Sequence, residues 1–258
     1  MSGLQALALP ILAQEFDRIA TEGERRGLIL RAFGGVGFYL HARNEELFTK
    51  LGRDPVNDLD LVGLSEQRNE YKKLLKELGY EIDWDLLVAG EGKRFSFQHI
   101  NEPPVEVDLF IDRLDMCHRI ELRDRLELQP RTIPLADLLL EKLQIVDLNR
   151  KDMVDVVVLL AEHELNGEGP DTVDLDYLSR LLADDWGFYY TAKLNLEKIR
   201  DFLGEAAAER ERATVAGSLE RIEAEIESAP KTRRWKLRAK IGTKKKWYQD
   251  VDEGIGAF

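Results

Sequence analysis

Acidic residues on two short apolar segments are the side chains of this sequence best placed for chemistry. In residues 56–62, Asp58 and Asp60 are two positions apart, and such residues point to the same face of a strand. Residues 105–112 alternate in the same way and place Asp108 on the polar face of a second strand. Adjacent carboxylates repel each other unless a cation lies between them. If the two strands are neighbours, the three aspartates form a set able to hold two divalent ions.

Such a set predicts phosphoryl or nucleotidyl transfer. Mg²⁺ takes oxygen ligands and usually retains waters or substrate phosphates. Two ions about 3.5 to 4 Å apart clamp the attacking and leaving oxygens of an in-line displacement. The expected cofactor is therefore a pair of Mg²⁺ ions, with Mn²⁺ as the alternative, and the expected substrate is an NTP. An Asp-x-Asp pair alone is more often a strand edge or a cap than a metal site.

A glycine cluster precedes the acidic pair and suggests where the phosphates would bind. Leu28 to Phe33 has the length and apolar character of a strand, and Phe38 to Leu51 has the apolar spacing of a helix. Between them, Gly34, Gly35 and Gly37 predict a sharp turn. A glycine turn that opens a helix offers backbone N–H groups to a phosphate without side-chain obstruction. The alternative is a plain turn without a ligand.

The remaining pattern predicts the elements that must position these residues. One predicted helix ends at Glu164, Pro230 follows the last one, and Gly187 is expected to interrupt the helix over 174–203. The expected elements are a helix over 4–26 with Pro10 in its first turn, a helix over 65–78 capped by Ser65 and stopped by Gly79, a hairpin over 80–100 with a strand at 86–88 and a turn at 90–92, and helices over 134–147, 152–164, 174–203 and 205–227.

These elements predict an α/β (α+β) fold, with a mixed sheet core flanked by helices, a helical C-terminal region and a basic tail. The expected boundaries are a core at 1–133 that includes the N-terminal packing helix, a helical domain at 134–229, and the tail at 230–258. In residues 184–190, an aromatic cluster follows two acids and is expected either to fill the core or to stack on a base.

Composition excludes several classes of protein. Of 258 residues, 44% are hydrophobic and 33% charged, which excludes disorder throughout. A single cysteine, Cys117, excludes an internal disulfide framework and fits a reducing compartment. The four histidines have no zinc-ligand spacing. No apolar run approaches the roughly 20 residues of a membrane span, so we expect a cytoplasmic protein without a membrane partner.

Charge is distributed unevenly along the chain. The net charge is −12, and residues 231–247 contribute nine cations and no acid, so the rest of the chain carries −21. Trp235, Trp247 and Tyr248 are interleaved with the cations of this tail (231–248). Phosphate neutralisation combined with aromatic stacking is typical of RNA binding. The alternative is a tail that folds back onto the acidic body.

These motifs resemble the nucleotidyltransferase superfamily, which includes DNA polymerase beta and the aminoglycoside nucleotidyltransferases. The matching residues are Gly34-Gly35, the segment Asp58-Leu59-Asp60, and Asp108. The resemblance implies a nucleotidyltransferase-type mixed sheet core, metal binding by the three aspartates, and assistance to the attacking hydroxyl by Asp108. It also implies that the two glycines contact the nucleotide.

Within that superfamily, residues 135–160 resemble the AbiE-type nucleotidyltransferase toxin group. Glu141-Lys142 match its Glu-Lys helix, and Arg150-Lys151-Asp152 through Asp155 match its basic-Asp-x-x-Asp sequence, so that the whole likeness covers residues 25–165. It implies that Lys142 contacts the triphosphate and that Asp152 or Asp155 is the acid of the last motif. The alternatives are an exposed helix lysine and helix N-terminal acids favoured by the dipole.

Two positions depart from the pattern, Val36-Gly37 after the glycine pair and Asn57 before the acidic pair. With these exceptions, the resemblance implies transfer of an NMP from an NTP to a hydroxyl, with pyrophosphate leaving. The acceptor would be tRNA or another RNA, and a cognate antitoxin would be a partner. The alternatives are a nucleotide- or RNA-binding module that has lost turnover, and a nucleotidyltransferase that modifies a small molecule such as an antibiotic.

Overall fold

A computed structural model describes residues 8–53, 55–56, 58–83, 94–99, 105–167, 169–206 and 209–251. The expected strand at 86–88, the turn at 90–92 and Asn57 lie outside these residues. In chain order the elements are α1 (Leu9–Arg25), β1 (Leu30–Ala32), α2 (Gly34–His41), α3 (Glu46–Lys50), β2 (Asp58–Gly63), α4 (Arg68–Glu77), β3 (Tyr80–Ile82), β4 (Arg94–His99), β5 (Glu106–Ile111), β6 (Arg113–Asp115), β7 (Arg119–Glu121), α6 (Leu135–Leu143), α7 (Arg150–Glu162), α8 (Leu175–Asp184), α9 (Trp186–Ala206), α10 (Glu209–Ser228) and α11 (Arg233–Ile241).

The described strands include a five-stranded mixed sheet in the order β1-β2-β5-β4-β3. Strands β2 and β5 run parallel at its centre, and the other neighbours are antiparallel. Strands β6 and β7 form a separate hairpin. The predicted mixed α/β architecture is therefore confirmed, and the two strands that carry the aspartates are direct neighbours.

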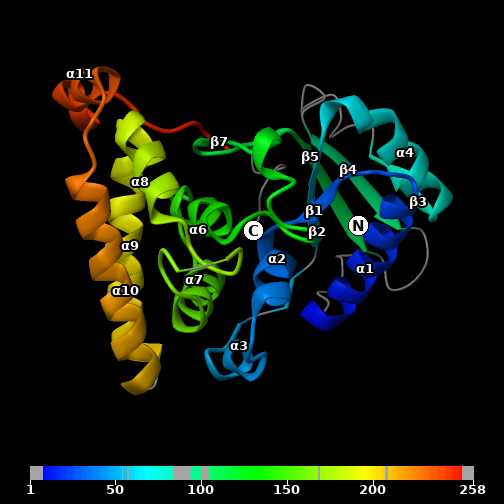
Figure 1. The fold of residues 1–258 in the computed structure, drawn as a ribbon, viewed down its shortest axis with the longest axis horizontal. Coiled ribbons are helices and arrows are strands. Elements are labelled where there is room, and N and C mark those ends of the chain that lie inside the picture. The colour runs from blue at the N-terminus through cyan, green and yellow to red at the C-terminus, as the bar shows by residue number, and fades with distance from the viewer. Residues whose placement is uncertain are drawn as a thin grey trace.

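The apolar residues of the central strands lie opposite their acidic neighbours. Leu59 and Leu61 are fully buried, as the period-two pattern predicts. Helices α1 and α4 pack against each other beside the sheet, and the apolar stripe of α1 includes the fully buried Phe16 and Ile19. Figure 1 shows α1 and α4 on one side of the sheet, with α2 and α6 on the other. The aspartates thus face the side where the helices after residue 134 are found.

The helix expected over 38–51 differs from the structure. The residues form two short helices, α2 and α3, and α2 already begins at Gly34. The interruption lies where the backbone N–H groups of Arg43 and Asn44 donate to the carboxylate of Glu162, at 2.7 and 3.0 Å. Those N–H groups therefore bond to α7 and do not continue the helix.

Ser65 also differs from the prediction, because it does not cap a helix. It opens a 3-10 turn at Ser65–Gln67, and α4 follows with no side-chain cap. The N–H of Ser65 donates to Asp112 Oδ1 at 2.9 Å, which holds this turn on the end of β5. Gly79 has φ +93° and ends the helical segment as predicted.

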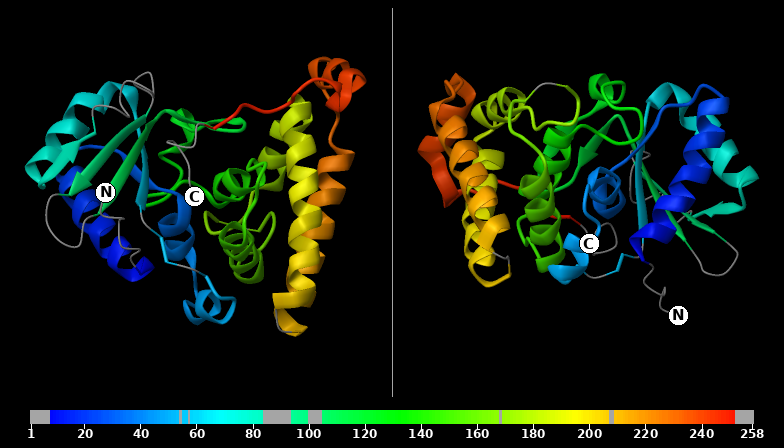
Figure 2. Two further views of the ribbon diagram at one scale, coloured as in Figure 1. Left: turned by 180° about the vertical axis from the view of Figure 1, so that it is seen from behind. Right: turned by 60° about the horizontal axis from the view of Figure 1, so that its bottom comes forward.

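The helices after residue 134 form the expected helical region. Helices α9 and α10 pack side by side at the end of the molecule away from the sheet (Figure 2). The expected break near Gly187 occurs at Asp185, whose Oδ1 accepts from the N–H groups of Gly187 and Phe188. The boundary between α8 and α9 therefore has a capping residue of its own. No helix among the described residues is long and apolar enough to cross a bilayer.

Candidate active site

The structure brings the three predicted aspartates together. The parallel register pairs Asp60 on β2 with Asp108 on β5, and Asp58 stands opposite Glu106. One oxygen of each of Asp58, Asp60 and Asp108 lies within 4.8 Å of the others. We call these three residues the aspartate triad. Asp60 and Asp108 are 4% and 1% exposed, so two of the three carboxylates are buried.

Burial and mutual repulsion make the charged form of the triad costly. Desolvation raises the pKa of Asp60 well above its ordinary value, and the carboxylates of Asp58 and Asp108 raise it further. The pKa of Asp58 is raised by burial and by Asp108. Glu106, on the same face, has its pKa raised to about 7 by burial and by the same neighbours. A bound cation would relieve all of these penalties.

Part of the compensating charge comes from β4. Arg94 pairs with Asp108 Oδ2, and Ser96 Oγ donates to Asp108 Oδ1. Both groups reach Asp108 because β4 is its antiparallel neighbour, with Ser96 directly opposite it. Both oxygens of Asp108 therefore have protein partners, whereas the buried Oδ1 of Asp60 has none.

This donor set fits a hard divalent cation. The triad offers carboxylate oxygens only, which suits Mg²⁺ or Mn²⁺. A buried carboxylate oxygen without a hydrogen-bond partner is unfavourable in the absence of a ligand, and Asp60 Oδ1 is such an atom. A metal bound to Asp108 would have to share that carboxylate with Arg94 or displace the Arg94 side chain from it.

Gly34 places the N-terminus of α2 against the triad. It has φ +59°, and a β-carbon there would lie inside van der Waals distance of Asp60 Oδ2 and 3.0 Å from Asp60 Cγ. Only glycine fits both the backbone angle and this approach. At Gly35, a β-carbon would lie 2.9 Å from Arg53 Nη2. The glycines thus form the first residues of α2, and the chain passes from β1 into the helix at the left-handed Gly34.

Glu141 fills the predicted phosphate position at this helix end. Its Oε2 accepts a hydrogen bond from the N–H of Gly34 at 3.1 Å. The side chain comes from α6, and only 3% of the residue is exposed. The structure therefore shows an internal carboxylate, next to Asp60, at the N–H group that the sequence assigns to a nucleotide phosphate.

Lys142 lies in a buried ion-pair network and not on a helix surface. Its Nζ is 3.0 Å from Glu141, 3.1 Å from Asp152 and 3.6 Å from Asp155. Arg53 donates two hydrogen bonds to Asp155, at 2.6 and 2.9 Å. The carboxylates raise the pKa of Lys142 against the opposing effect of burial, which keeps it charged. The alternative of an exposed lysine is thus wrong.

Asp152 has two structural partners. It is the N3 residue of α7 and forms a capping box with the N-cap Asn149, as expected of a helix N-terminal acid. It also pairs with Lys142. Together with Asp155 it places the α7 N-terminus beside α6. The residues of the last two sequence motifs therefore meet in one cluster, which contacts the triad through Glu141 and Gly34.

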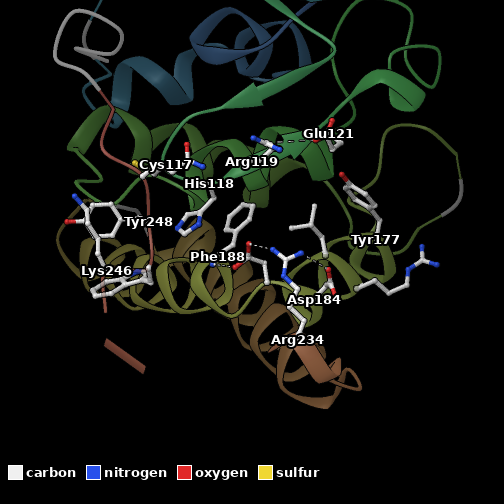
Figure 3. A pocket seen from close by; sticks show the side chains of 15 residues that line it. Cys117, His118, Arg119, Glu121, Tyr177, Asp184, Phe188, Arg234, Lys246 and Tyr248 are labelled. Atoms are coloured by element: carbon white, nitrogen blue, oxygen red, sulfur yellow. Dashed lines mark hydrogen bonds and ion pairs between the residues drawn. The ribbon is translucent and has the colours of Figure 1, made fainter. Parts of the chain in front are cut away.

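A separate cavity of about 900 Å³ lies between the β6–β7 hairpin and the helical region (Figure 3). None of the triad residues lines it. Arg119 and Glu121 border it on the hairpin side, and Arg234, which pairs with Asp184, borders it on the helical side. Its lining carries charges of both signs, and it is separate from the aspartate triad.

The basic tail is folded where the structure describes it. Helix α11 is capped by Thr232, and Trp235 packs edge-to-face on Tyr189. Trp247 donates from Nε1 to Thr191 at 3.0 Å, so two of the expected stacking residues contact α9. In the aromatic cluster of 184–190, Trp186, Phe188 and Tyr189 are buried, which agrees with the core alternative. Lysines 240, 244 and 245 remain exposed.

Sequence reasoning gave no role to Arg94, Ser96, Glu141 and Arg53. Arg94 and Ser96 could have been found, because they alternate with Phe95 and Phe97 and so belong to the polar face of β4. Glu141 was noted only as part of the Glu-Lys motif, and its contact with Gly34 joins residues 107 positions apart, which no local pattern indicates.

Comparison with known proteins gives one structural likeness to report. No family model matches the chain, and no curated protein matches it. Among solved structures, the chain is similar to an antigenic nucleotidyltransferase-like protein from Paracoccidioides brasiliensis, with a TM-score of 0.42 and 11% sequence identity, over 88% of this chain and 97% of that one. A likeness at this level carries no argument about the site, which rests on its own geometry.

Proposed function

We propose that this chain is a metal-dependent nucleotidyltransferase that moves an NMP from an NTP to a hydroxyl and releases pyrophosphate. One observation carries the proposal: three carboxylate oxygens lie within 4.8 Å of one another, and Asp60 has a buried oxygen, Oδ1, without a hydrogen-bond partner while its other oxygen, Oδ2, lies against the N-terminus of α2. In such an arrangement, a cation held by the carboxylates would lie next to a phosphate bound at the helix N-terminus. Phosphoryl chemistry needs positioning and charge stabilisation above all, and this geometry supplies both.

The roles we propose for the triad and the glycines are those that the family resemblance implies, and the contacts of each residue support them. Asp58 and Asp60 hold the metal pair, and Asp108 holds one ion and assists the attacking hydroxyl. When bound, two Mg²⁺ ions would neutralise the triphosphate and stabilise the attacking and leaving oxygens. Arg94, already paired with Asp108, supplies a positive charge at the edge of the same site. Gly34 and Gly35 bring the α2 N-terminus to the phosphates.

For Lys142 we propose a positioning role. The resemblance implies a contact with the triphosphate, but this ammonium already has three carboxylate partners and is 3% exposed. Held there, it fixes Glu141 on one side and Asp152 on the other. It therefore connects α6 and α7 to the residues around Gly34.

The acceptor we propose is tRNA or another RNA, as in the AbiE-type group, with a cognate antitoxin protein as a further partner. The exposed cations of α11 and the following turn support this choice, because they are available to phosphates although Trp235 and Trp247 pack internally. An acceptor bound mainly through phosphates would bind less tightly as salt is raised.

A labelling experiment tests the proposal. Pure protein is incubated with Mg²⁺ and each labelled NTP in turn, with and without total RNA. Label retained on RNA, and lost in Asp58→Asn, supports the proposal. The matched control is Asp112→Asn, at a carboxylate outside the triad whose left-handed backbone, φ 62°, asparagine also tolerates. Nucleotide binding without transfer would instead support a binding module.

The RNA acceptor is tested separately through the exposed lysines. Removal of residues 231–258 would uncover Tyr189 and Thr191, so we choose the substitutions Lys240→Gln, Lys244→Gln and Lys245→Gln. We expect transfer to RNA to fall and its salt dependence to weaken. Unchanged transfer to RNA would contradict docking through these lysines, and transfer to a small molecule alone would support the antibiotic-modifying alternative.

A further inference from the structure

Glu141 lies where an anion is bound most favourably at the triad. The first N–H groups of a helix have no partner within the helix, and the helix dipole adds positive potential there. At α2, which is eight residues long, the N–H of Gly34 donates to Glu141 Oε2 at 3.1 Å. A phosphate oxygen bound at this N–H would occupy the same place as Oε2.

A second observation points to a ligand at this helix end besides Glu141. The buried Oδ1 of Asp60 has no hydrogen-bond partner, and the other oxygen of Asp60 lies directly against Gly34. Two carboxylates therefore approach one helix N-terminus, and one of them has an unused oxygen. A metal-bound phosphate satisfies both, because its cation binds Asp60 and its oxygen accepts from Gly34.

Glu141 can leave Gly34 without losing its charge partner. Its Oε1 lies 3.0 Å from Lys142 Nζ, whereas Oε2 is the atom that accepts from Gly34. Rotation of the carboxylate away from α2 would break the single hydrogen bond to Gly34 and keep the ion pair. Lys142 in turn remains held by Asp152 and Asp155.

We propose that Glu141 is an internal competitor for the phosphate site, which a triphosphate must displace and which only a metal-bound triphosphate displaces well. This inference rests on the proposed function. Without the metal, an incoming phosphate would meet the negative charges of Glu141 and the triad together. With the metal bound first at the triad, that repulsion is relieved and Glu141 turns to Lys142. The residue thus favours metal-complexed nucleotides over free ones.

Binding of inorganic tripolyphosphate tests this, because the probe has no base or sugar and reports on the phosphate site alone. Calorimetry is carried out on the full chain with and without Mn²⁺, for wild type, Glu141→Gln and Glu141→Asp. Glutamine keeps the shape and loses the charge, and aspartate keeps the charge and is too short to reach Gly34. We expect both variants to bind tripolyphosphate about tenfold more tightly than wild type, since a charge-assisted hydrogen bond no longer has to be displaced.

The selectivity for metal gives a second readout. In wild type, Mn²⁺ should increase tripolyphosphate affinity strongly, and this increase should be smaller in Glu141→Gln. The matched control is Asp137→Asn, a buried acid of the same helix whose ion-pair partner is Arg125. We expect the control to bind as wild type does. Melting curves of each variant confirm that it is folded.

Two results would overturn the inference in different ways. If wild type binds tripolyphosphate with Mn²⁺, and both Glu141 variants bind it equally or more weakly, Glu141 is not a competitor and the proposed function stands. If neither wild type nor the variants bind it, although Mn²⁺ binds, the phosphate site at Gly34 does not exist. In that case the proposed function fails as well.

Discussion

Replacement of Lys142 by methionine should destabilise the protein severely. Methionine keeps most of the side-chain length and removes the charge that faces Glu141, Asp152 and Asp155. Arg53, on Asp155, is then the one remaining cation in this group of side chains. Loss of one partner from a buried ionic cluster costs about 3 to 5 kcal/mol. For a domain of this size that corresponds to a fall in melting temperature of roughly 6 to 20 °C.

Thermal unfolding followed by circular dichroism, in buffer without metal or nucleotide, measures this effect. The control is Lys198→Met, an exposed lysine whose Nζ donates to the carbonyl of Val146, and it should change the free energy of unfolding by about 0.5 kcal/mol or less. The double variant Lys142→Met/Asp152→Asn should be less destabilised than the sum of its single variants, because the neutral amide removes an unpaired charge.

The result that would refute this reasoning is a Lys142→Met protein as stable as the Lys198→Met control but with weakened NTP binding. Such a protein would show that Lys142 is not an internal counter-ion and reaches the triphosphate directly. Equal losses in the double variant and in the sum of the single variants would also contradict the network, because they would show no coupling between Lys142 and Asp152.

Three further predictions follow from the same geometry. Gly34→Ala should abolish Mn²⁺ binding, because the new β-carbon would collide with Asp60. The control Gly27→Ala also has a positive φ, +70°, but no atom lies within 4 Å of its β-carbon, so it should cause only backbone strain. Equal Mn²⁺ binding by the two variants would refute the steric argument. Mn²⁺ affinity should keep rising with pH above the range in which an ordinary aspartate titrates, since burial raises the pKa of Asp60 and the proton must leave before metal binds. A pH-independent affinity in a titration series would contradict this. The pKa of Glu106 is raised to about 7 in the folded state, so the stability that Glu106 contributes is present below its ordinary pKa and is lost as pH rises through 7. Glu106→Gln should therefore make the melting temperature in metal-free buffer depend less on pH. A pH profile identical to that of wild type would contradict this prediction.

Local periodicity was enough to predict the strands that carry the triad. Asp58 and Asp60 share a face because strands repeat every two residues, and Leu59 and Leu61 are buried for the same reason. The pairing of β2 with β5 was a conditional expectation, since nothing local determines which strands become neighbours. The sheet fulfils that condition with Asp60 opposite Asp108.

Long-range contacts explain what the pattern missed. The helix expected over 38–51 is interrupted because Glu162, more than a hundred residues later, accepts from two of its backbone N–H groups. For Lys142 the sequence offered a contact with the triphosphate or an exposed place on the helix surface, and the structure instead buries it where α6 packs on α7. Such contacts depend on tertiary packing, about which the periodicity of the sequence carries no information.

The aspartate triad as a divalent cation site is the central claim, and electron paramagnetic resonance of Mn²⁺ tests it most directly. Free Mn²⁺ is titrated into metal-free wild type, Asp60→Asn and the control Asp112→Asn at pH 8, and bound ion is counted from the loss of the free signal. We predict saturable binding to wild type and to the control, competition by Mg²⁺, and loss of this binding in Asp60→Asn. Equal Mn²⁺ binding by all three proteins, or none by wild type, would contradict the claim.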